Sequence, residues 1–170
     1  LEQKKGIKRL PDSIDFRKHS GYVRLDQEKA IEYYSQRMYD FFDVDLINRA
    51  HKEHGFSWVF TTQNGAAGPW ARRIMDRITP GVTTILKEQP LSDFGGLESG
   101  PNTEKYWQLD YLSKDVVSRK TDGGGATDGD GDRLYFVDEN GTRLKFYEAM
   151  VLLHWYTQEI RKLDGELVTC

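Results

Sequence analysis

The sequence predicts an α/β protein, a three-layer α/β/α sandwich with a mostly parallel mixed sheet. Short runs of β-forming residues alternate with segments of helical periodicity, which is typical of parallel strands joined by helices. The 170 residues are 38% hydrophobic and 30% charged, which fits a single globular domain over residues 26–165. Residues 1–25 show little periodicity and are expected to form an arm or linker, and residues 166–170 are expected to start a further, truncated strand.

Composition excludes several classes of function. The net charge of −3 gives no basic footprint for nucleic acid or an anionic membrane surface. No apolar run approaches the roughly 20 residues that span a bilayer. The first residues, Leu1–Lys5, carry no signal-peptide pattern, so a cytoplasmic protein is expected. The single cysteine, Cys170, excludes an intramolecular disulfide.

Two helices are predicted at the start of the domain. Asp26 is a suitable N-cap for the first, and Asp43 or Asp45 for a shorter second helix. His51 and His54 lie three residues apart on the second helix, but no third ligand is nearby, so surface histidines are favoured over a metal pair. The apolar positions of the first helix share one face: Ile31, Tyr34, Met38, Phe41 and Phe42.

A strand, a glycine turn and a helix follow. Residues 57–62 are rich in β-formers, residues 63–68 (the glycine turn) leave the strand sharply, and Pro69 suits the first helical position. A helical stripe then continues through Ile74 and Ile78. A glycine turn that enters a helix can also bind an anion on free N–H groups. The purely structural turn is favoured over that phosphate-binding alternative.

The next segments predict a second strand, a long loop and a third helix. Residues 82–86 read as the strand and residues 87–101 as the loop, and Asn102 or Thr103 is expected to cap the helix. Residues 123–126 contain three glycines, which suit a buried strand only where backbones approach closely. The inward positions of the helix are Tyr106, Leu109, Leu112 and Val116.

The last part of the chain predicts a hairpin and a final helix. Residues 134–137 read as a strand, residues 139–141 as a turn and residues 142–145 as a short partner strand. His154 on the final helix is expected to be a surface or a satisfied core histidine. The apolar face of this helix contains Ala149, Leu152, Leu153, Tyr156 and Ile160.

The candidate site is Asp128-Gly129-Asp130-Gly131-Asp132-Arg133, the aspartate loop. Three short carboxylate side chains at alternate positions converge only if the backbone curls, which Gly129 and Gly131 permit by tolerating positive φ. Carboxylates held this close repel one another unless a cation lies between them. A hard divalent ion, Mg²⁺ or Ca²⁺, is the cation that such carboxylate ligands bind. The alternative is an acidic, solvated turn, but strict alternation followed by an apolar run favours a metal loop.

Four stretches in this order resemble the second domain of the α-D-phosphohexomutases, the family of phosphoglucomutase and phosphomannomutase. They are residues 64–74, 90–96, 124–133 and 137–141, and the resemblance covers roughly residues 26–170. It implies one domain of a multi-domain enzyme, packed against the other domains around a cleft. The motif Pro-Leu-Ser-Asp-Phe-Gly-Gly at residues 90–96 resembles phosphoglucomutase more closely than phosphomannomutase.

The resemblance implies transfer of a phosphoryl group between O1 and O6 of a hexose, of the glucose 1-phosphate/glucose 6-phosphate type. Asp128, Asp130 and Asp132 would hold Mg²⁺, and Arg133 would have a catalytic role towards the phosphoryl group. The alternative for Arg133 is an ion pair with the aspartates of its own loop.

Several family motifs are missing from these residues. The sequence lacks the family's Ser-His-Asn-Pro loop, its Gly-Glu-x-Ser-Gly sugar loop and its Ser-Gly-Thr phosphate loop, so these residues alone are expected to be inactive. The hexose phosphate would then be bound through domains outside them. Residues 98–102 also depart from the family's Pro-x-Pro-Asn pattern.

Two other interpretations remain open. In a calcium-binding EF-hand, the three aspartates would occupy positions 1, 3 and 5, and Glu139 position 12. Arg133 then stands where that loop needs glycine, and the segment after it reads as a strand instead of a helix. The third interpretation is an isolated or engineered domain that keeps the fold but has no activity of its own.

Overall fold

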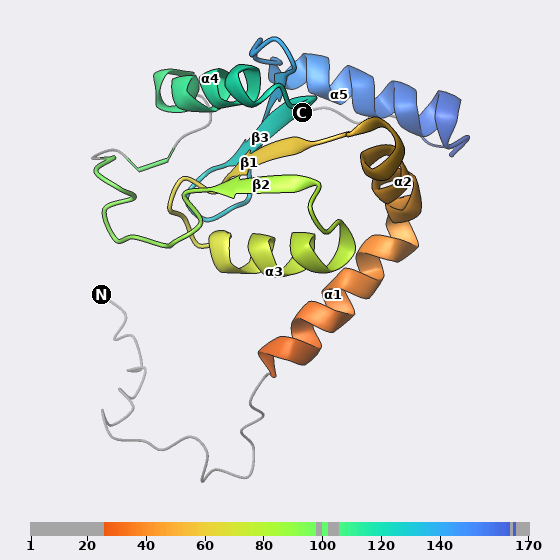
Figure 1. The fold of residues 1–170 in the computed structure, drawn as a ribbon, viewed down its shortest axis with the longest axis horizontal. Coiled ribbons are helices and arrows are strands. Elements are labelled where there is room, and N and C mark those ends of the chain that lie inside the picture. The colour runs from red at the N-terminus through yellow and green to blue at the C-terminus, as the bar shows by residue number, and fades with distance from the viewer. Residues whose placement is uncertain (1–25, 98–99, 102–105, 164, 166–170) are drawn as a thin grey trace, which may run out of the picture.

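The computed structural model describes residues 26–97, 100–101, 106–163 and 165 (Figure 1). A four-stranded sheet forms its centre, and helices lie on both sides of the sheet, with α3 and α4 on opposite sides in Figure 1. The predicted α/β class is therefore confirmed. The expected arm at residues 1–25 and the expected strand start at residues 166–170 lie outside the described residues.

The sheet has the order β2-β1-β3-β4. β1 pairs in parallel with both β2 and β3, whereas β4 runs antiparallel to β3, so the sheet is mixed and mostly parallel as predicted. The strands are β1 (Trp58–Thr61), β2 (Thr83–Leu86), β3 (Gly123–Thr127) and β4 (Leu134–Asp138). Because three strands share a direction, the carboxyl ends of β1, β2 and β3 meet at one edge of the sheet.

The helices begin close to the predicted caps. The Asp26 carboxylate accepts hydrogen bonds from the Glu28 and Lys29 N–H groups, and Asp43 accepts one from the Leu46 N–H at 2.8 Å. These side chains satisfy backbone donors that a helix start leaves without partners. The α-helices are α1 (Gln27–Phe41), α2 (Val44–His54), α3 (Gly68–Ile78), α4 (Asp110–Arg119) and α5 (Phe146–Trp155).

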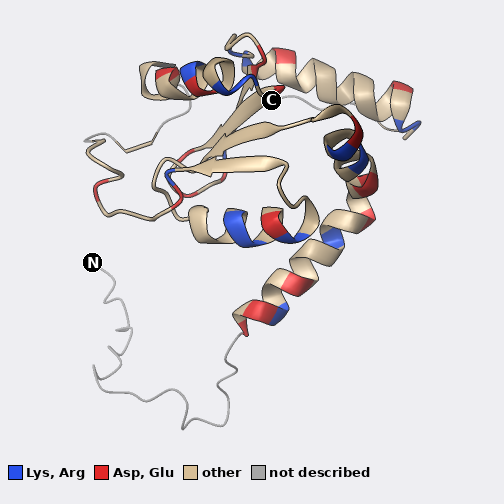
Figure 2. Ribbon diagram, viewed as in Figure 1, with Lys and Arg blue, Asp and Glu red and all other residues tan. Residues whose placement is uncertain are grey.

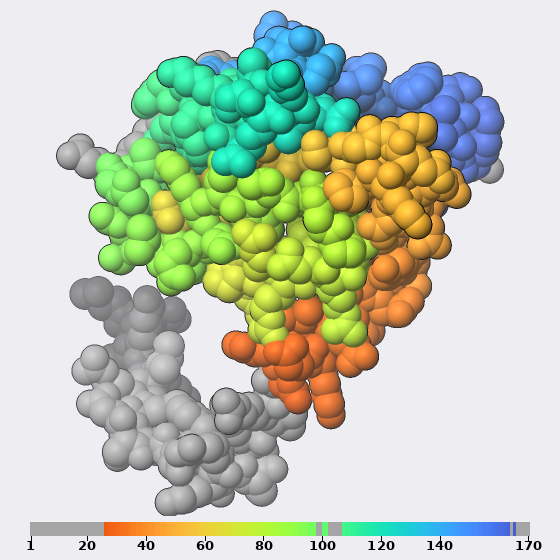
Figure 3. Space-filling model, in the orientation of Figure 1, coloured from red at the N-terminus to blue at the C-terminus, as the bar shows by residue number. Residues whose placement is uncertain are grey.

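The structure buries only part of the predicted apolar face of the first helix. Ile31 and Ser35 are buried, whereas Tyr34 and Phe41 are exposed, and Phe42 is the C-cap. The reason is that α1 packs against α3, with ion pairs Arg73–Glu28 and Arg77–Glu32 at the edge of that contact. In the space-filling view the orange surface of α1 meets the green surface of α3 directly (Figure 3).

One hydrophobic core lies between the sheet and α4. Its members include the fully buried side chains of Val59, Leu109, Leu112 and Val116. A Cβ atom built on Gly124 would lie 2.7 Å from Val116 Cγ2 and 3.1 Å from the Val59 carbonyl oxygen. The predicted close approach of backbones in the glycine-rich strand is therefore present, and it lets α4 pack directly onto β3.

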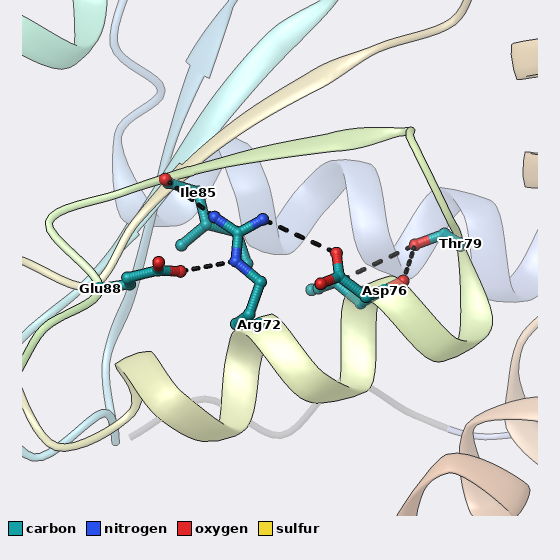
Figure 4. A network of polar contacts seen from close by, with 6 residues as sticks. Arg72, Asp76, Thr79, Ile85 and Glu88 are labelled. Atoms are coloured by element: carbon teal, nitrogen blue, oxygen red, sulfur yellow. Dashed lines mark hydrogen bonds and ion pairs between the residues drawn. The ribbon is translucent and has the colours of Figure 1, made fainter.

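A polar network joins α3 to the end of β2 (Figure 4). The Arg72 Nε–H donates to the Glu88 carboxylate at 2.6 Å, and an Arg72 Nη–H donates to the Ile85 carbonyl oxygen at 3.4 Å. Arg72 also lies 3.7 Å from Asp76, one turn further along α3. One guanidinium group thus ties a helix to the strand that it covers.

Three expectations for the second half need adjustment. The segment before α4 is a 3-10 helix over Tyr106–Leu109, and the expected caps Asn102 and Thr103 lie outside the described residues. The expected partner strand at residues 142–145 is reduced to one bridge, Val137 with Arg143. Helix α5 exists, but it continues as a π-helical segment over Tyr156–Ile160, and none of its side chains is buried. Its apolar residues therefore form an exposed surface.

No helix in the described part of the chain is both long enough and apolar enough to cross a membrane.

We expect Gly124→Ala to lower the free energy of unfolding by about 1–3 kcal/mol, because the new methyl group overlaps a closely packed core. Urea denaturation measures the change. The matched control is Gly125→Ala in the same strand, where the nearest atom is a Phe60 ring carbon at 3.2 Å. Equal losses in the two variants would contradict the packing described for α4.

Candidate metal centre

The aspartate loop connects β3 to β4 and curls around its first carboxylate. Asp128 is only 5% exposed, and its Oδ1 accepts hydrogen bonds from the Gly131 N–H at 3.1 Å and the Arg133 N–H at 3.3 Å. These bonds draw the later residues of the loop back towards Asp128. The curled backbone that the sequence predicts is thus built around this side chain.

The three aspartates of the loop gather in space. Asp128, Asp130 and Asp132 each offer an oxygen atom, and these atoms lie within 4.8 Å of one another. The negative charge of Asp130 is the largest cause of a raised pKa at Asp132, and Asp128 adds to it. Carboxylate oxygens crowded in this way, with two of the three residues exposed, match the oxygen ligands of a hard divalent cation. The donor set fits Mg²⁺.

Only one of the two glycines in the loop has the predicted conformation. Gly131 has φ +86°, the left-handed conformation that was expected. Gly129 does not have positive φ; instead, a Cβ atom there would lie 3.1 Å from the Phe94 ring. Gly129 therefore serves the close approach of the loop at residues 87–97 to the aspartate loop.

Arg133 lies over the aspartates of its own loop. Its Nε is 3.5 Å from Asp128 Oδ2 and 3.8 Å from Asp132 Oδ1, and the side chain is 57% exposed. The ion pair that was the alternative role of Arg133 is thus present in the structure. The same residue lines an open cleft of about 440 Å³ whose other lining residues are Ala66, Phe94, Gly100, Pro101, Asp128, Gly129 and Asp130.

The glycine turn at residues 63–68 packs against the aspartate loop. The Ala66 N–H donates to the Gly129 carbonyl oxygen at 2.9 Å, and the Gly65 N–H donates to the Thr62 carbonyl oxygen at 2.7 Å. The Gly68 N–H also has a carbonyl partner, Gly65 at 3.4 Å. Because these N–H groups are used within the chain, the turn is structural, as favoured from the sequence, and does not offer them to a phosphate.

Gln63 also belongs to this site, although it was not among the residues predicted from the sequence. It is fully buried, and its Nε2–H donates to the Thr127 carbonyl oxygen at 2.7 Å, immediately before Asp128. A long polar side chain directly after a buried strand was the available signal. Nearby, Tyr111 of α4 lies 2.6 Å from Thr61 Oγ1, and burial raises the pKa of this tyrosine to about 12.

The remaining candidates do not form a second site. His54 is exposed, as predicted for a surface histidine, whereas His51 is half-buried and its Nδ1 lies 2.7 Å from the Phe56 carbonyl oxygen. Glu139 follows β4, and the five strand residues Leu134–Asp138 separate it from the aspartate loop. A strand of this length rises ~16 Å, so Glu139 is not placed to act as the ligand at position 12 of an EF-hand loop. Among the described residues, the aspartates are the one cluster of three potential metal ligands.

Comparison with protein families gives a direct match to this region. The family described as "Phosphoglucomutase/phosphomannomutase, alpha/beta/alpha domain II" matches residues 32–141, which include both the glycine turn and the aspartate loop. The chain belongs to this family. The resemblance noted in the sequence is therefore confirmed, and residues 32–141 correspond to domain II of the phosphoglucomutases and phosphomannomutases.

Individual relatives agree with this assignment. Phosphoglucomutase 1 of Saccharomyces cerevisiae is 34% identical over 143 residues, which are 80% of this chain and 24% of the yeast protein. A probable phosphoglucosamine mutase of Methanobrevibacter smithii is 32% identical over 125 residues, 74% of this chain and 26% of that protein. The chain thus spans about a quarter of the length of these curated relatives.

A solved structure supports the fold. The crystal structure of a putative phosphomannomutase from Thermus thermophilus superposes with a TM-score of 0.64, at 19% sequence identity. The match covers 83% of this chain and 30% of the other. At this level of identity the likeness extends to the fold alone, and it confirms the predicted sandwich of a sheet between helices.

We expect Asp130→Asn to stabilise the metal-free protein at pH 7, because it removes the charge that most strongly opposes ionisation of Asp132. In the folded protein this repulsion raises the pKa of Asp132 above its unfolded value, so it weakens the fold only once both carboxyls are ionised. The gain should therefore disappear as pH falls below about 4, the ordinary pKa of aspartate. Urea midpoints at pH 7 and pH 3 measure it, and a lower midpoint at pH 7 would contradict the crowding.

Proposed function

We propose that this chain is the metal-binding domain of a phosphohexomutase, an isomerase that moves a phosphoryl group within a hexose phosphate of the glucose type. The observation that carries the proposal is the gathering of three aspartates at the carboxyl end of β3, within domain II of this family. Ligands of open α/β sheets bind outside the carboxyl ends of the strands, which is where the aspartate loop lies. The preference for glucose rests on the sequence of residues 90–96, which resembles phosphoglucomutase more than phosphomannomutase.

The residues of the loop would have two roles: the aspartates would bind the metal ion, and Arg133 would contact the negatively charged phosphoryl group. Asp128 is fixed by two backbone N–H groups, Asp130 and Asp132 are exposed, and one oxygen of each of the three lies within 4.8 Å of the others. Mg²⁺ held there would supply a Lewis acid for phosphoryl transfer. Arg133 borders the same cleft. Once its planar guanidinium group releases the aspartates, that group is suited to bidentate contact with a phosphoryl group.

The other groups needed for turnover would come from further domains of a longer protein. The relatives are about four times as long as the part that they share with this chain. Helix α5 is nearly free of charged side chains in Figure 2, and six of its large hydrophobic residues are more than half exposed: Phe146, Tyr147, Val151, Leu152, Leu153 and Trp155. A helix that is apolar on all sides is normally buried. We therefore assign this surface to contact with the rest of the enzyme.

The metal site is tested by titration with Mn²⁺ or Mg²⁺. We expect one ion per chain at millimolar concentration, and weaker binding in Asp130→Asn, because one of the three carboxylates is lost. Glu139→Gln is the matched control: it removes one carboxylate from the far end of β4 and should leave the affinity unchanged. An affinity loss of about tenfold in Glu139→Gln, about 1.4 kcal/mol, would instead support the calcium-binding interpretation.

The exposed surface of α5 gives a second test. Val151→Gln should change the free energy of unfolding by less than about 0.5 kcal/mol, because this side chain is 61% exposed. It should also reduce self-association in sedimentation velocity, since it breaks an apolar patch. Val116→Gln, at a fully buried position, is the control and should be strongly destabilising. A comparable loss in Val151→Gln would mean that this face is already covered within the chain.

A further inference from the structure

Gln63 adopts a conformation that is unusual for its residue type. It has φ +51° and the next residue, Asn64, has φ +59°, and both lie in the left-handed region. The Gly65 N–H donates to the Thr62 carbonyl oxygen, so the two residues form the centre of a tight turn at the end of β1. Left-handed conformations are unfavourable for residues with a Cβ atom and persist only where the surroundings compensate.

The compensation comes from the end of β1 and from β3, the strand that carries the aspartate loop. The Gln63 Nε2–H donates to the Thr127 carbonyl oxygen at 2.7 Å, and the Gln63 N–H donates to Thr61 Oγ1 at 3.3 Å. Three residues later, the Ala66 N–H donates to the Gly129 carbonyl oxygen. Thr127 and Gly129 are the two neighbours of Asp128, so the turn holds the backbone on both sides of the first candidate metal ligand.

Simple packing does not account for an amide at this position. Gln63 is fully buried, yet its Oε1 atom finds no hydrogen-bond partner among the described residues. Burying an amide oxygen without a partner is unfavourable, and an apolar side chain of the same length would avoid that cost. The feature that distinguishes glutamine from such a side chain here is the hydrogen bond to Thr127.

We propose that Gln63 is a positioning residue, whose side-chain amide fixes the peptide group before Asp128 and thereby the direction of that carboxylate. The inference rests on the proposed metal site. The bond restrains rotation of the Thr127–Asp128 peptide group. Without it, the peptide group before Asp128 can rotate and shift the carboxylate that the Gly131 and Arg133 N–H groups hold, which moves it away from Asp130 and Asp132.

The test compares Mn²⁺ binding by the whole chain, measured by electron paramagnetic resonance, before and after Gln63→Met. Methionine keeps the length of the side chain but has no donor, so we expect binding to weaken by about tenfold. Gln63→Gly also removes the donor but relieves the left-handed conformation, and it should lose affinity to the same extent. Affinities are expressed per folded molecule, with the folded fraction taken from circular dichroism.

Asn48→Leu is the matched control. The Asn48 Nδ2–H donates to the Ile78 carbonyl oxygen at 2.8 Å, which is a bond of the same kind between α2 and the end of α3. Its removal should cost stability without changing Mn²⁺ affinity. If Gln63→Met and Asn48→Leu behave alike, Gln63 has only a structural role and the inference is wrong.

A measurement on the metal-free, unmodified protein makes the test independent of how well the variants fold. In native-state hydrogen exchange, the Ala66 and Arg133 N–H groups should open together as urea is added, because both depend on the junction of the glycine turn with the aspartate loop. Independent opening of the two groups overturns the inference.

The remaining outcomes separate this inference from the metal site itself. If the unmodified chain binds Mn²⁺ and Gln63→Met binds within twofold of it, the positioning role fails while the metal site stands. If Gln63→Gly regains the affinity that Gln63→Met loses, backbone conformation is responsible and the amide is not. If the unmodified chain binds no Mn²⁺, the metal site and the inference fail together.

Discussion

The parallel pairing of β1 with β3 is the contact on which the rest of the structure depends. It joins Val59, Phe60 and Thr61 to Gly124, Gly125 and Ala126, and it places the glycine turn beside the aspartate loop at one edge of the sheet. Because Gly124 has no side chain, α4 covers this pair from one side at short distance. Both the core and the candidate site are therefore consequences of the same strand pair.

Local patterns predicted most of the elements because their causes are local. Asp26 and Asp43 are helix caps, and residues 134–137 lie in a strand, as their own side chains indicate. The three aspartates also came from sequence alone, since alternate spacing around glycine is a property of a short segment. The predicted burial of α1 was right for Ile31 but not for Tyr34 or Phe41, because it depends on which neighbour the helix meets, and α3 lies 27 or more residues further along the chain.

The part of the site that the sequence did not reveal is the part made by distant residues. Gln63 and Thr127 are 64 positions apart, and no periodicity or spacing in the sequence relates them. The different roles of Gly129 and Gly131 depend in the same way on where Phe94 lies. The alternation of aspartate and glycine indicated that glycine was needed in the loop. Only the structure shows that Gly131 is needed for its positive φ and Gly129 for its close approach to Phe94.

The antiparallel direction of β4 has a consequence for the order of folding. Thr127 pairs with Leu134, so the aspartate loop is the short connection of a hairpin and closes over very few residues. Closing such a loop loses little chain entropy, whereas bringing residue 63 to residue 127 requires a much longer loop to close. We therefore expect the carboxylates to be gathered early by a local event and to reach their final orientation late, when the two halves of the sheet join.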